Sequence, residues 1–180
     1  STHEGEDKII LDSFNLIKKD FPSVKLVVVP RHPERANKIK NLFFKMGSKS
    51  TYENEEEISS DILIVKSLGI LPTLYADAQL AFVGGSLVNR GGHNIIEPAI
   101  AQCPFILGEH YFNFKNIVES FINANATYIV KTPLDIFKLF SKTYKNQDNL
   151  RESMIRNANT VVEKNIGATM RQLSLIRASL

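Results

Sequence analysis

The sequence predicts an α/β fold in which a parallel sheet is covered by helices on both faces. Short runs rich in β-branched residues alternate with segments of helical period along the 180 residues, and this alternation is typical of such folds. Two of the runs, Asp61–Val65 and Leu80–Val83, are almost continuously apolar, as strands buried on both faces are. A chain of this length can form one domain with a sizeable core.

Six segments carry the strand signal: Lys25–Val29, Lys49–Tyr52, Asp61–Val65, Leu80–Val83, Phe105–Leu107 and Tyr128–Val130. Helices are predicted at Asp7–Lys19, Glu34–Met46, Pro72–Ala76, Asn94–Gln102, Asn113–Ala124 and Pro133–Tyr144. In the second of these, apolar residues recur at spacings of three and four, which makes one face apolar, and Gly47 is placed to end the helix in a left-handed cap. Residues 1–148 therefore form the predicted α/β domain.

The remaining segment, residues 149–180, carries helical period throughout. We predict helices there that pack back on the domain, with a break at residues 165–167, where Gly167 lies. The start of the chain differs from a complete doubly wound domain, which opens on its central strand. Here the polar turn Ser1–Glu6 leads directly into a helix, so we expect a fragment whose first strand lies upstream.

Composition excludes several classes of protein. Twenty-two basic and 19 acidic residues give a net charge of +3, and the lysines are scattered, so no nucleic-acid partner is expected. The single Cys103 sits in an apolar stretch and is predicted to be a buried, unreactive thiol in a reducing compartment. No apolar run approaches the roughly 18 residues of a membrane span, and the polar start differs from a signal peptide.

The densest polar cluster runs from Gly84 to Glu97, between a predicted strand and a predicted helix. Open α/β sheets bind ligands at the carboxyl ends of their strands, and paired glycines let backbone amides approach an anion. Glycine amides for a phosphate and the Glu97 carboxylate for two ribose hydroxyls would together hold a nucleotide. The alternative is purely structural: Asn94 caps the helix and Glu97 completes a capping box. Both interpretations stay open.

Arg31 and His32 follow the strand Lys25–Val29 and should emerge at the same sheet edge. Arg31 suits a phosphate or carboxylate, although Pro33 and Glu34 are equally explained as the start of a helix. His93 and Glu97 have the spacing of one helical face, but no further ligand stands at metal-site spacing, so we expect no metal. Neither a G-x-S-x-G elbow nor a P-loop motif occurs.

Three motifs in order, Ser1–Glu6, Val29–Arg35 and Phe82–Pro98, resemble the carboxyl-terminal half of 3-deoxy-D-manno-octulosonic acid (Kdo) transferases. The resemblance implies a Rossmann-like, three-layer α/β/α domain, the donor-binding half of a GT-B glycosyltransferase. Such enzymes transfer Kdo from CMP-Kdo to a lipid A precursor at the cytoplasmic face of the bacterial inner membrane, in lipopolysaccharide synthesis. It further implies no cofactor or metal, and a catalytic base, an acceptor site and membrane contacts in an N-terminal domain. This chain would then be soluble and inactive alone.

The resemblance also implies the contacts. Glu97 would bind the cytidine ribose, Arg31 the donor charge, and backbone near Leu68 the cytosine. The implied donor-binding residues are Arg31, His32, Leu68, Gly69, Gly84, Gly85, Ser86, Gly91, Gly92, His93, Asn94 and Glu97, with Ser1, Thr2 and His3 at the cleft edge; no catalytic residue is expected in this chain.

One segment departs from the family pattern. Where the family tends to show D-T-x-G-E-L, this chain has residues 66–71 as K-S-L-G-I-L, so the expected acid is replaced by Ile70. The contacts to the base or ribose at that point are therefore open. Two other functions also remain: another GT-B enzyme that uses a UDP-sugar, and a non-catalytic nucleotide-binding module.

Overall fold

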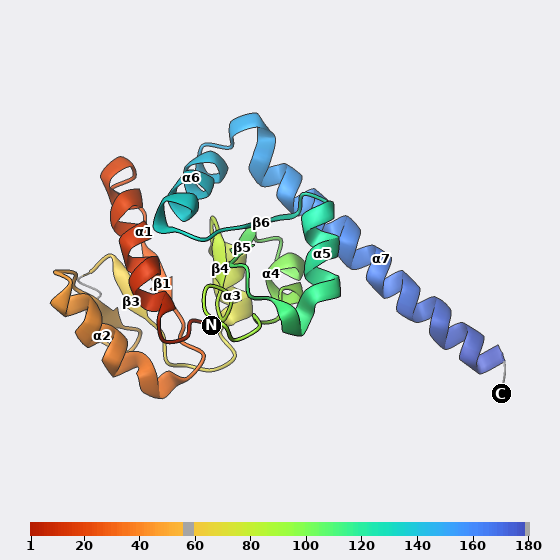
Figure 1. The fold of residues 1–180 in the computed structure, drawn as a ribbon, viewed down its shortest axis with the longest axis horizontal. Coiled ribbons are helices and arrows are strands. Elements are labelled where there is room, and N and C mark those ends of the chain that lie inside the picture. Colours follow the sequence, from red (N-terminus) through yellow and green to blue (C-terminus); the bar gives the residue numbers. More distant parts are fainter. Residues whose placement is uncertain (56–59, 179–180) are drawn as a thin grey trace.

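The structure, a computed structural model, describes residues 1–55 and 60–178. Its strands are β1 (Leu26–Val28), β2 (Thr51–Tyr52), β3 (Ile62–Ile64), β4 (Ala81–Val83), β5 (Phe105–Leu107) and β6 (Thr127–Ile129). Its α-helices are α1 (Glu6–Asp20), α2 (Ala36–Lys45), α3 (Leu71–Asp77), α4 (Ile96–Ile100), α5 (Lys115–Asn123), α6 (Pro133–Tyr144) and α7 (Leu150–Ala178). The predicted α/β class is confirmed, and each predicted strand overlaps an observed one (Figure 1).

The strands pair in parallel, as predicted, but they form two sheets and not one. The first sheet has the order β1-β3-β2 and the second the order β4-β5-β6. A single parallel bridge joins Thr2 to Pro30, just beyond the end of β1. Strands β1 and β4 are each the edge strand of their sheet.

Apolar side chains hold each sheet to its own set of helices. Around the first sheet, Leu11 and Phe14 of α1 and Ile39 and Phe43 of α2 pack on β1 and β3. The second sheet has a larger cluster, to which α3, α4, α5 and α7 contribute. Helices α1 and α6 lie side by side and connect the two halves through Ile17, Phe21 and Phe140 in one small cluster. Figure 1 shows this pair on one side of the strands and α4 on the other.

The local signals that placed the helices are visible at their ends. Gly47, with φ of +80°, follows α2 in the left-handed conformation, as predicted. Helix α6 spans the predicted residues and begins with a capping box between Thr132 and Asp135. Helix α4 is shorter than predicted at both ends, because Asn94, Ile95, Ala101 and Gln102 lie outside it.

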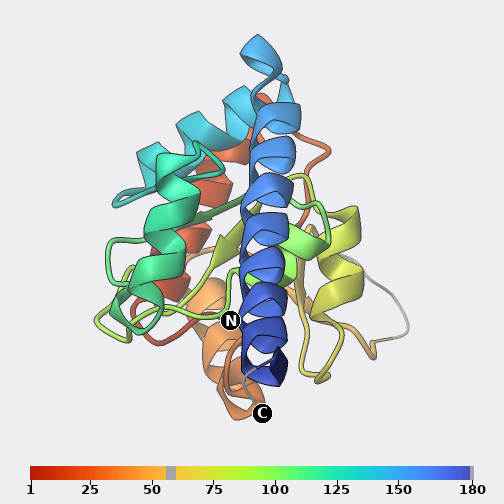
Figure 2. The same ribbon diagram turned by 90° about the vertical axis from the view of Figure 1, so that its right-hand side faces the viewer.

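The C-terminal segment is one helix. The predicted break at residues 165–167 was wrong, since α7 continues from Leu150 to Ala178. Its first part packs on the second sheet's cluster through Ala158 and Val161, and Met154, spaced to share the same face, is also buried. Figure 2 shows α7 crossing the face of the molecule, and in Figure 1 its last turns extend past the other elements. The last two residues of the predicted 149–180 segment lie outside the described residues.

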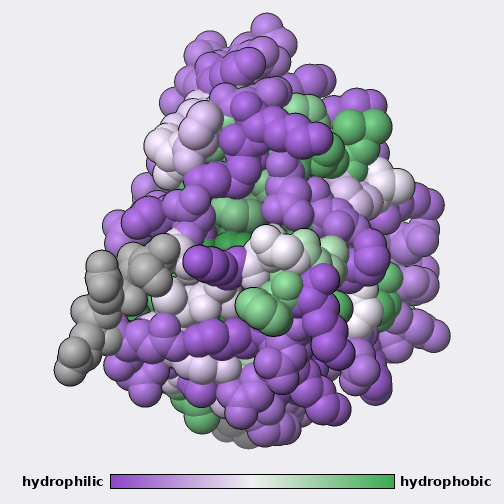
Figure 3. Space-filling view, turned by 90° about the vertical axis from the view of Figure 1, so that its left-hand side faces the viewer, coloured by the Kyte–Doolittle hydropathy of each residue, from purple (hydrophilic) through white to green (hydrophobic). Residues whose placement is uncertain are grey.

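The surface is largely polar. The face shown in Figure 3 is dominated by hydrophilic side chains, with apolar atoms exposed in a hollow near its centre. No helix within the described residues combines the length and apolar character needed to cross a membrane. Cys103 is buried, and burial raises the pKa of its thiol to about 12, which agrees with an unreactive cysteine.

Candidate functional site

The first residues of the chain lie where the two sheets meet. Thr2 donates its backbone N–H to the carbonyl of Val29 (3.4 Å), and its own carbonyl accepts from the backbone N–H of Arg31 (3.1 Å). On the other side, the carbonyl of Ser1 lies so close to Gly84 that a Cβ there would approach it to 2.1 Å. Only glycine therefore fits at position 84 without displacing the backbone. The structure thus brings the first, second and third sequence motifs together at one sheet edge.

Glu6 occupies the centre of this junction. The residue is fully buried, and its carboxylate accepts backbone N–H groups from Gly85 (2.8 Å), Ser86 (3.0 Å) and Leu87 (3.0 Å), as well as from His3 (2.8 Å). Such a cradle of successive amides is an anion site. In this protein the anion in the cradle is the Glu6 carboxylate.

This arrangement corrects the predicted amide cradle for a phosphate. The amides of Gly85 and Ser86 are used by Glu6, and the Gly92 amide donates to the carbonyl of Gly85 (2.8 Å). Ser86 is fully buried, its hydroxyl bonded to the Val83 carbonyl and the Gly108 amide. The glycines serve close packing between loops, and ligand contacts of these loops stay a prediction.

Asn94 and Glu97 form only half of the capping box that was the predicted structural alternative. Asn94 Oδ1 accepts the backbone N–H of Ile96 (3.0 Å), so Asn94 does satisfy the start of α4. Glu97 does not reach back to the backbone of Asn94; its Oε1 accepts from the Asn94 side-chain amide (3.2 Å). Glu97 remains exposed, and Asn94 orients its carboxylate. The carboxylate is therefore held in place and accessible to a ligand.

Three predicted histidines gather beside these loops. His3 and His93 stack with ring centroids 5.0 Å apart, and their Nε2 atoms are 2.8 Å apart. His32 meets His3 edge to face at 5.8 Å. Because one Nε2 of the stacked pair must accept, at least one of the two rings is neutral. The described residues include no group of three or more His, Cys, Asp or Glu side chains placed to hold a metal ion.

Charged groups surround the histidines. Arg31 is exposed, and its charge adds to burial and to His3 in lowering the pKa of His93; Glu97, four residues after His93, is also exposed. A positive and a negative side chain therefore flank the same surface. An anion with vicinal hydroxyls nearby, such as a nucleoside monophosphate, has complementary groups.

Comparisons with known proteins support one family. The chain is 35% identical over its whole length to the 3-deoxy-D-manno-octulosonic acid transferase of Haemophilus influenzae, and 36% identical over 76% of its length to that of Aquifex aeolicus. The solved C-terminal CMP-Kdo binding domain of WaaA from Acinetobacter baumannii matches with a TM-score of 0.82 and 30% identity, covering 90% of this chain and 86% of that one. No protein-family model matches.

The chain belongs to the 3-deoxy-D-manno-octulosonic acid transferase family. It corresponds to the C-terminal domain of such a transferase, and the predicted membership and GT-B fold are confirmed. It spans 43% of the length of the Haemophilus influenzae transferase and 38% of that of Aquifex aeolicus.

The loop that departs from the usual transferase pattern lies between β3 and α3. Leu68 is 84% exposed, and Gly69 adopts a φ of +79° just before α3. The backbone amides of Lys66 and Ser67 are held by Glu53 Oε1 (2.8 and 2.9 Å). Glu53, which follows β2, thus sets the conformation of this loop. The contact of the loop with a nucleotide base stays a prediction.

Sequence analysis missed two buried groups of this transferase domain. Glu6 was recognised only as part of a motif, and the ion pair between Asp7 and Arg35 was not foreseen. Arg35 also donates to the carbonyl of Thr2 (2.7 Å). An available signal was the pair of adjacent acids that follows Gly5 at the start of an otherwise apolar helix face, since acids on such a face need buried partners.

The histidine pair predicts a pH dependence of stability. Burial, followed by the proximity of His3, lowers the pKa of His93 from 6.5 to about 4. Between these values the unfolded chain binds more protons than the folded one, so the free energy of unfolding falls as the pH falls from 6.5 to 4. In urea unfolding, His93→Gln should lose less stability over this interval than the wild type does. His110→Gln, outside the stacked pair, is the control; equal pH profiles for His93→Gln and wild type would contradict the expectation.

Proposed function

We propose that this chain is the donor-binding half of a Kdo transferase and binds CMP-Kdo at the junction of its two sheets. Support comes from the transferase relatives and from the related domain, which is described as CMP-Kdo binding. The chain covers less than half of those relatives. We therefore propose that the catalytic base, the lipid A precursor site and the contacts with the cytoplasmic face of the inner membrane belong to the rest of the polypeptide, and that the 180 residues alone transfer no Kdo.

The observation that carries the proposal is the exposed carboxylate of Glu97, which accepts a hydrogen bond from the side chain of Asn94, the residue after His93. A carboxylate accepts hydrogen bonds from two vicinal ribose hydroxyls, and charge-assisted bonds of this kind are strong. Arg31 supplies positive charge at the same edge. With the Gly85 and Ser86 amides used by Glu6, we assign the phosphate charge to Arg31 in place of the glycine loop.

The proposed chemistry is an inverting transfer without a metal. An acceptor hydroxyl attacks the anomeric carbon of Kdo while the base that we assign to the rest of the polypeptide takes its proton, and CMP leaves with the electrons of the bond between the anomeric carbon and the phosphate oxygen. Negative charge grows on the leaving phosphate, and Arg31 would stabilise it most in the transition state. The contribution of this domain is therefore to bind and orient the donor.

Glu97→Ala tests the ribose contact. Loss of two charge-assisted hydrogen bonds should weaken CMP binding by about 2 kcal/mol, or about 30-fold in Kd, measured by titration calorimetry. Glu119→Ala, which removes a half-exposed acid on α5, should leave the Kd unchanged. The wild-type chain is also titrated with UMP and with UDP. Unchanged CMP affinity in Glu97→Ala would contradict the site, and tighter binding of UDP than of CMP would favour a UDP-sugar enzyme.

A further inference from the structure

The loop of residues 66–70 is held by a side chain from the neighbouring strand end. Glu53, which follows β2, accepts three hydrogen bonds at Oε1. Two come from the backbone N–H groups of Lys66 (2.8 Å) and Ser67 (2.9 Å), and the third comes from the Ser67 hydroxyl (3.0 Å). An acceptor shared by two successive amides fixes the orientation of both peptide groups. The first half of the loop is therefore tied to the end of β2.

The side chain of Lys66 makes a second connection to the same strand end. Its ammonium group lies 3.6 Å from the centroid of the Tyr52 ring, in a cation–π contact, and the Tyr52 hydroxyl donates to Asn37 Oδ1 (2.7 Å). Lys66 stands where the family pattern has an acid, and a lysine side chain has no acceptor. The carboxylate that holds this loop is therefore supplied by Glu53, from outside the motif.

The second half of the loop is open and has unused hydrogen-bonding groups. Leu68 is 84% exposed, and a Cβ added to Gly69 would meet no atom within 4 Å. Among the described residues, the backbone N–H groups of Leu68 and Gly69 find no acceptor. These two donors are therefore available to a ligand.

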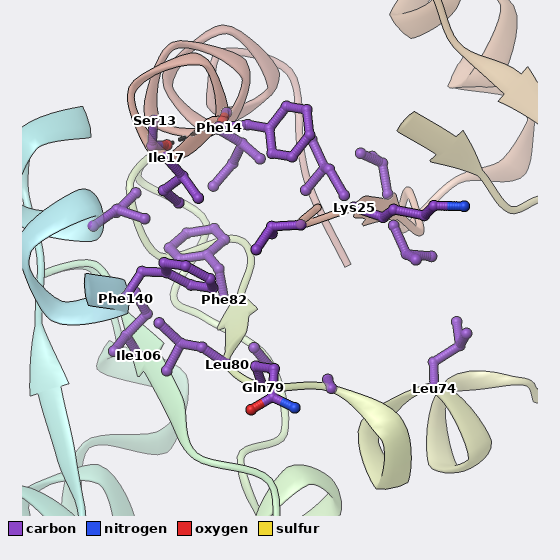
Figure 4. Close-up of a pocket in the computed structure, with 18 of the residues that line it drawn as sticks. Ser13, Phe14, Ile17, Lys25, Leu74, Gln79, Leu80, Phe82, Ile106 and Phe140 are labelled. Carbon is purple, nitrogen blue, oxygen red and sulfur yellow. Dashed lines mark hydrogen bonds between the residues drawn. The ribbon is translucent and has the colours of Figure 1, made fainter. Parts of the chain in front are cut away.

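The loop lies at the sheet edge where we place the nucleotide. Strand β3 lies between β1 and β2, and the Val65 N–H donates to the carbonyl of Val28 (2.9 Å), so the loop begins beside the segment that carries Arg31. It leads into α3, which packs on α4, the helix with Glu97 in its first turn. On its other side α3 lines a cavity of about 550 Å³ between the two sheets and directs Leu74 into it (Figure 4).

We propose that Glu53 is a positioning residue that makes the site select cytosine over uracil, by holding this loop in one conformation. This role rests on the proposed function, which places the phosphate at Arg31 and the ribose at Glu97. The base then lies against the open half of the loop, where the amides of Leu68 and Gly69 donate to O2 and N3 of cytosine. In uracil N3 carries a hydrogen, so that a donor would face a donor.

Selection by such a loop depends on its rigidity. A loop that is free to turn one peptide group can present a carbonyl to the N3–H of uracil, and it then binds both bases. A loop that Glu53 holds keeps its donors in place and leaves one of them unpaired when uracil binds. Unpaired donors of this kind are what lets a hydrogen-bonding site reject a close analogue.

Titration calorimetry with CMP and UMP tests this role. The wild-type chain should bind CMP at least about 10-fold more tightly than UMP, the size expected from an unpaired donor. Glu53→Ala should lower this ratio to about 3 or less, mainly through weaker binding of CMP, because the loop must then be ordered by the ligand. Glu53→Gln keeps an acceptor oxygen and should retain a ratio near that of the wild type.

Two controls separate base selection from a general loss of the site. Glu55→Ala removes an acid of the same segment whose carboxylate pairs with Lys40 of α2 (2.6 Å), and it should leave the ratio unchanged. Ribose 5-phosphate, which has no base, should bind equally to the wild type and to Glu53→Ala.

Amide exchange measured by NMR reports the loop directly. In Glu53→Ala, exchange should become at least about 10-fold faster at Lys66 and Ser67, which lose their acceptor. Exchange should not change at Leu26, whose N–H bonds to the carbonyl of Asp61 in the first sheet. Faster exchange at Leu26 as well would show that the sheet and not the loop has been disturbed.

Four results would overturn this role of Glu53. They are equal affinity of the wild type for CMP and UMP, an unchanged ratio in Glu53→Ala, a ratio lowered equally by Glu55→Ala or Glu53→Gln, and an equal loss of affinity for ribose 5-phosphate. A failure of the proposed function is distinct, because CMP affinity would then be unchanged in Glu97→Ala. If Glu97→Ala weakens CMP binding while Glu53→Ala leaves the ratio unchanged, the nucleotide site stands and Glu53 has no part in selecting the base.

Discussion

Glu6→Ala is expected to lower the free energy of unfolding by about 3 to 6 kcal/mol. The substitution leaves four backbone N–H groups without their acceptor, those of His3, Gly85, Ser86 and Leu87, of which the Gly85 and Ser86 groups are buried. An unsatisfied buried donor costs about 1 to 3 kcal/mol. Because the whole stability of a domain is about 5 to 15 kcal/mol, a substantial part of it should be lost.

Urea unfolding followed by circular dichroism measures this loss. Glu4→Ala is the matched control, since Glu4 is an exposed acid of the same segment. Glu6→Gln should fall between the wild type and Glu6→Ala, because the amide retains one acceptor oxygen but turns an N–H donor toward another donor. A midpoint for Glu6→Ala within error of the Glu4→Ala value would show that the glycine loop does not depend on this carboxylate.

Arg35→Met is the second large effect, with an expected cost of about 3 to 5 kcal/mol. Arg35 bonds both the carboxylate of Asp7 and the carbonyl of Thr2 (2.7 Å), and the Asp7 side chain is only 5% exposed. Burial raises the pKa of Asp7 even with Arg35 present. Without its partner, Asp7 must either stay charged in an apolar space or bind a proton.

The matched control is Lys38→Met, which removes an exposed cation from α2. The double variant Asp7→Asn with Arg35→Met should recover part of the stability that Arg35→Met loses, since no unpaired charge then remains. If the double variant is no more stable than Arg35→Met alone, the loss comes from packing of the arginine stem and not from the buried charge.

Local patterns sufficed for most elements of this fold. Runs of β-branched and apolar residues placed the six strands, and a period of about 3.6 residues placed the helices, each within a few residues, because such patterns report which side chains a regular backbone turns to the core. The prediction failed at Gly167, where a single glycine inside a helical pattern was taken for a break and α7 continues. One glycine costs a helix only about 1 kcal/mol, which its neighbours compensate.

The glycine loops were predicted at the correct place in the fold, but their contacts were not predicted. Gly85 and Gly92 were correctly placed at the carboxyl edge of the sheet, yet their amides bond to Glu6 and to the carbonyl of Gly85. A hydrogen bond between residues 79 positions apart leaves no trace in local composition. From the residues alone, Glu6 could not be distinguished from an acid that is favourable in the first turn of a helix.

By itself, the amino-acid sequence determined the α/β class, the parallel strands, the buried Cys103 and the family, because these follow from local periodicity and from motifs that are read in order along the chain. Only the tertiary structure decided that the strands form two sheets with a cavity between them, that Glu6 occupies the amide cradle and that His3 stacks on His93. These features depend on contacts between segments that are distant in the sequence. The free energy of such contacts is set by side-chain packing and by the pairing of buried polar groups, which neighbouring residues in the chain do not determine.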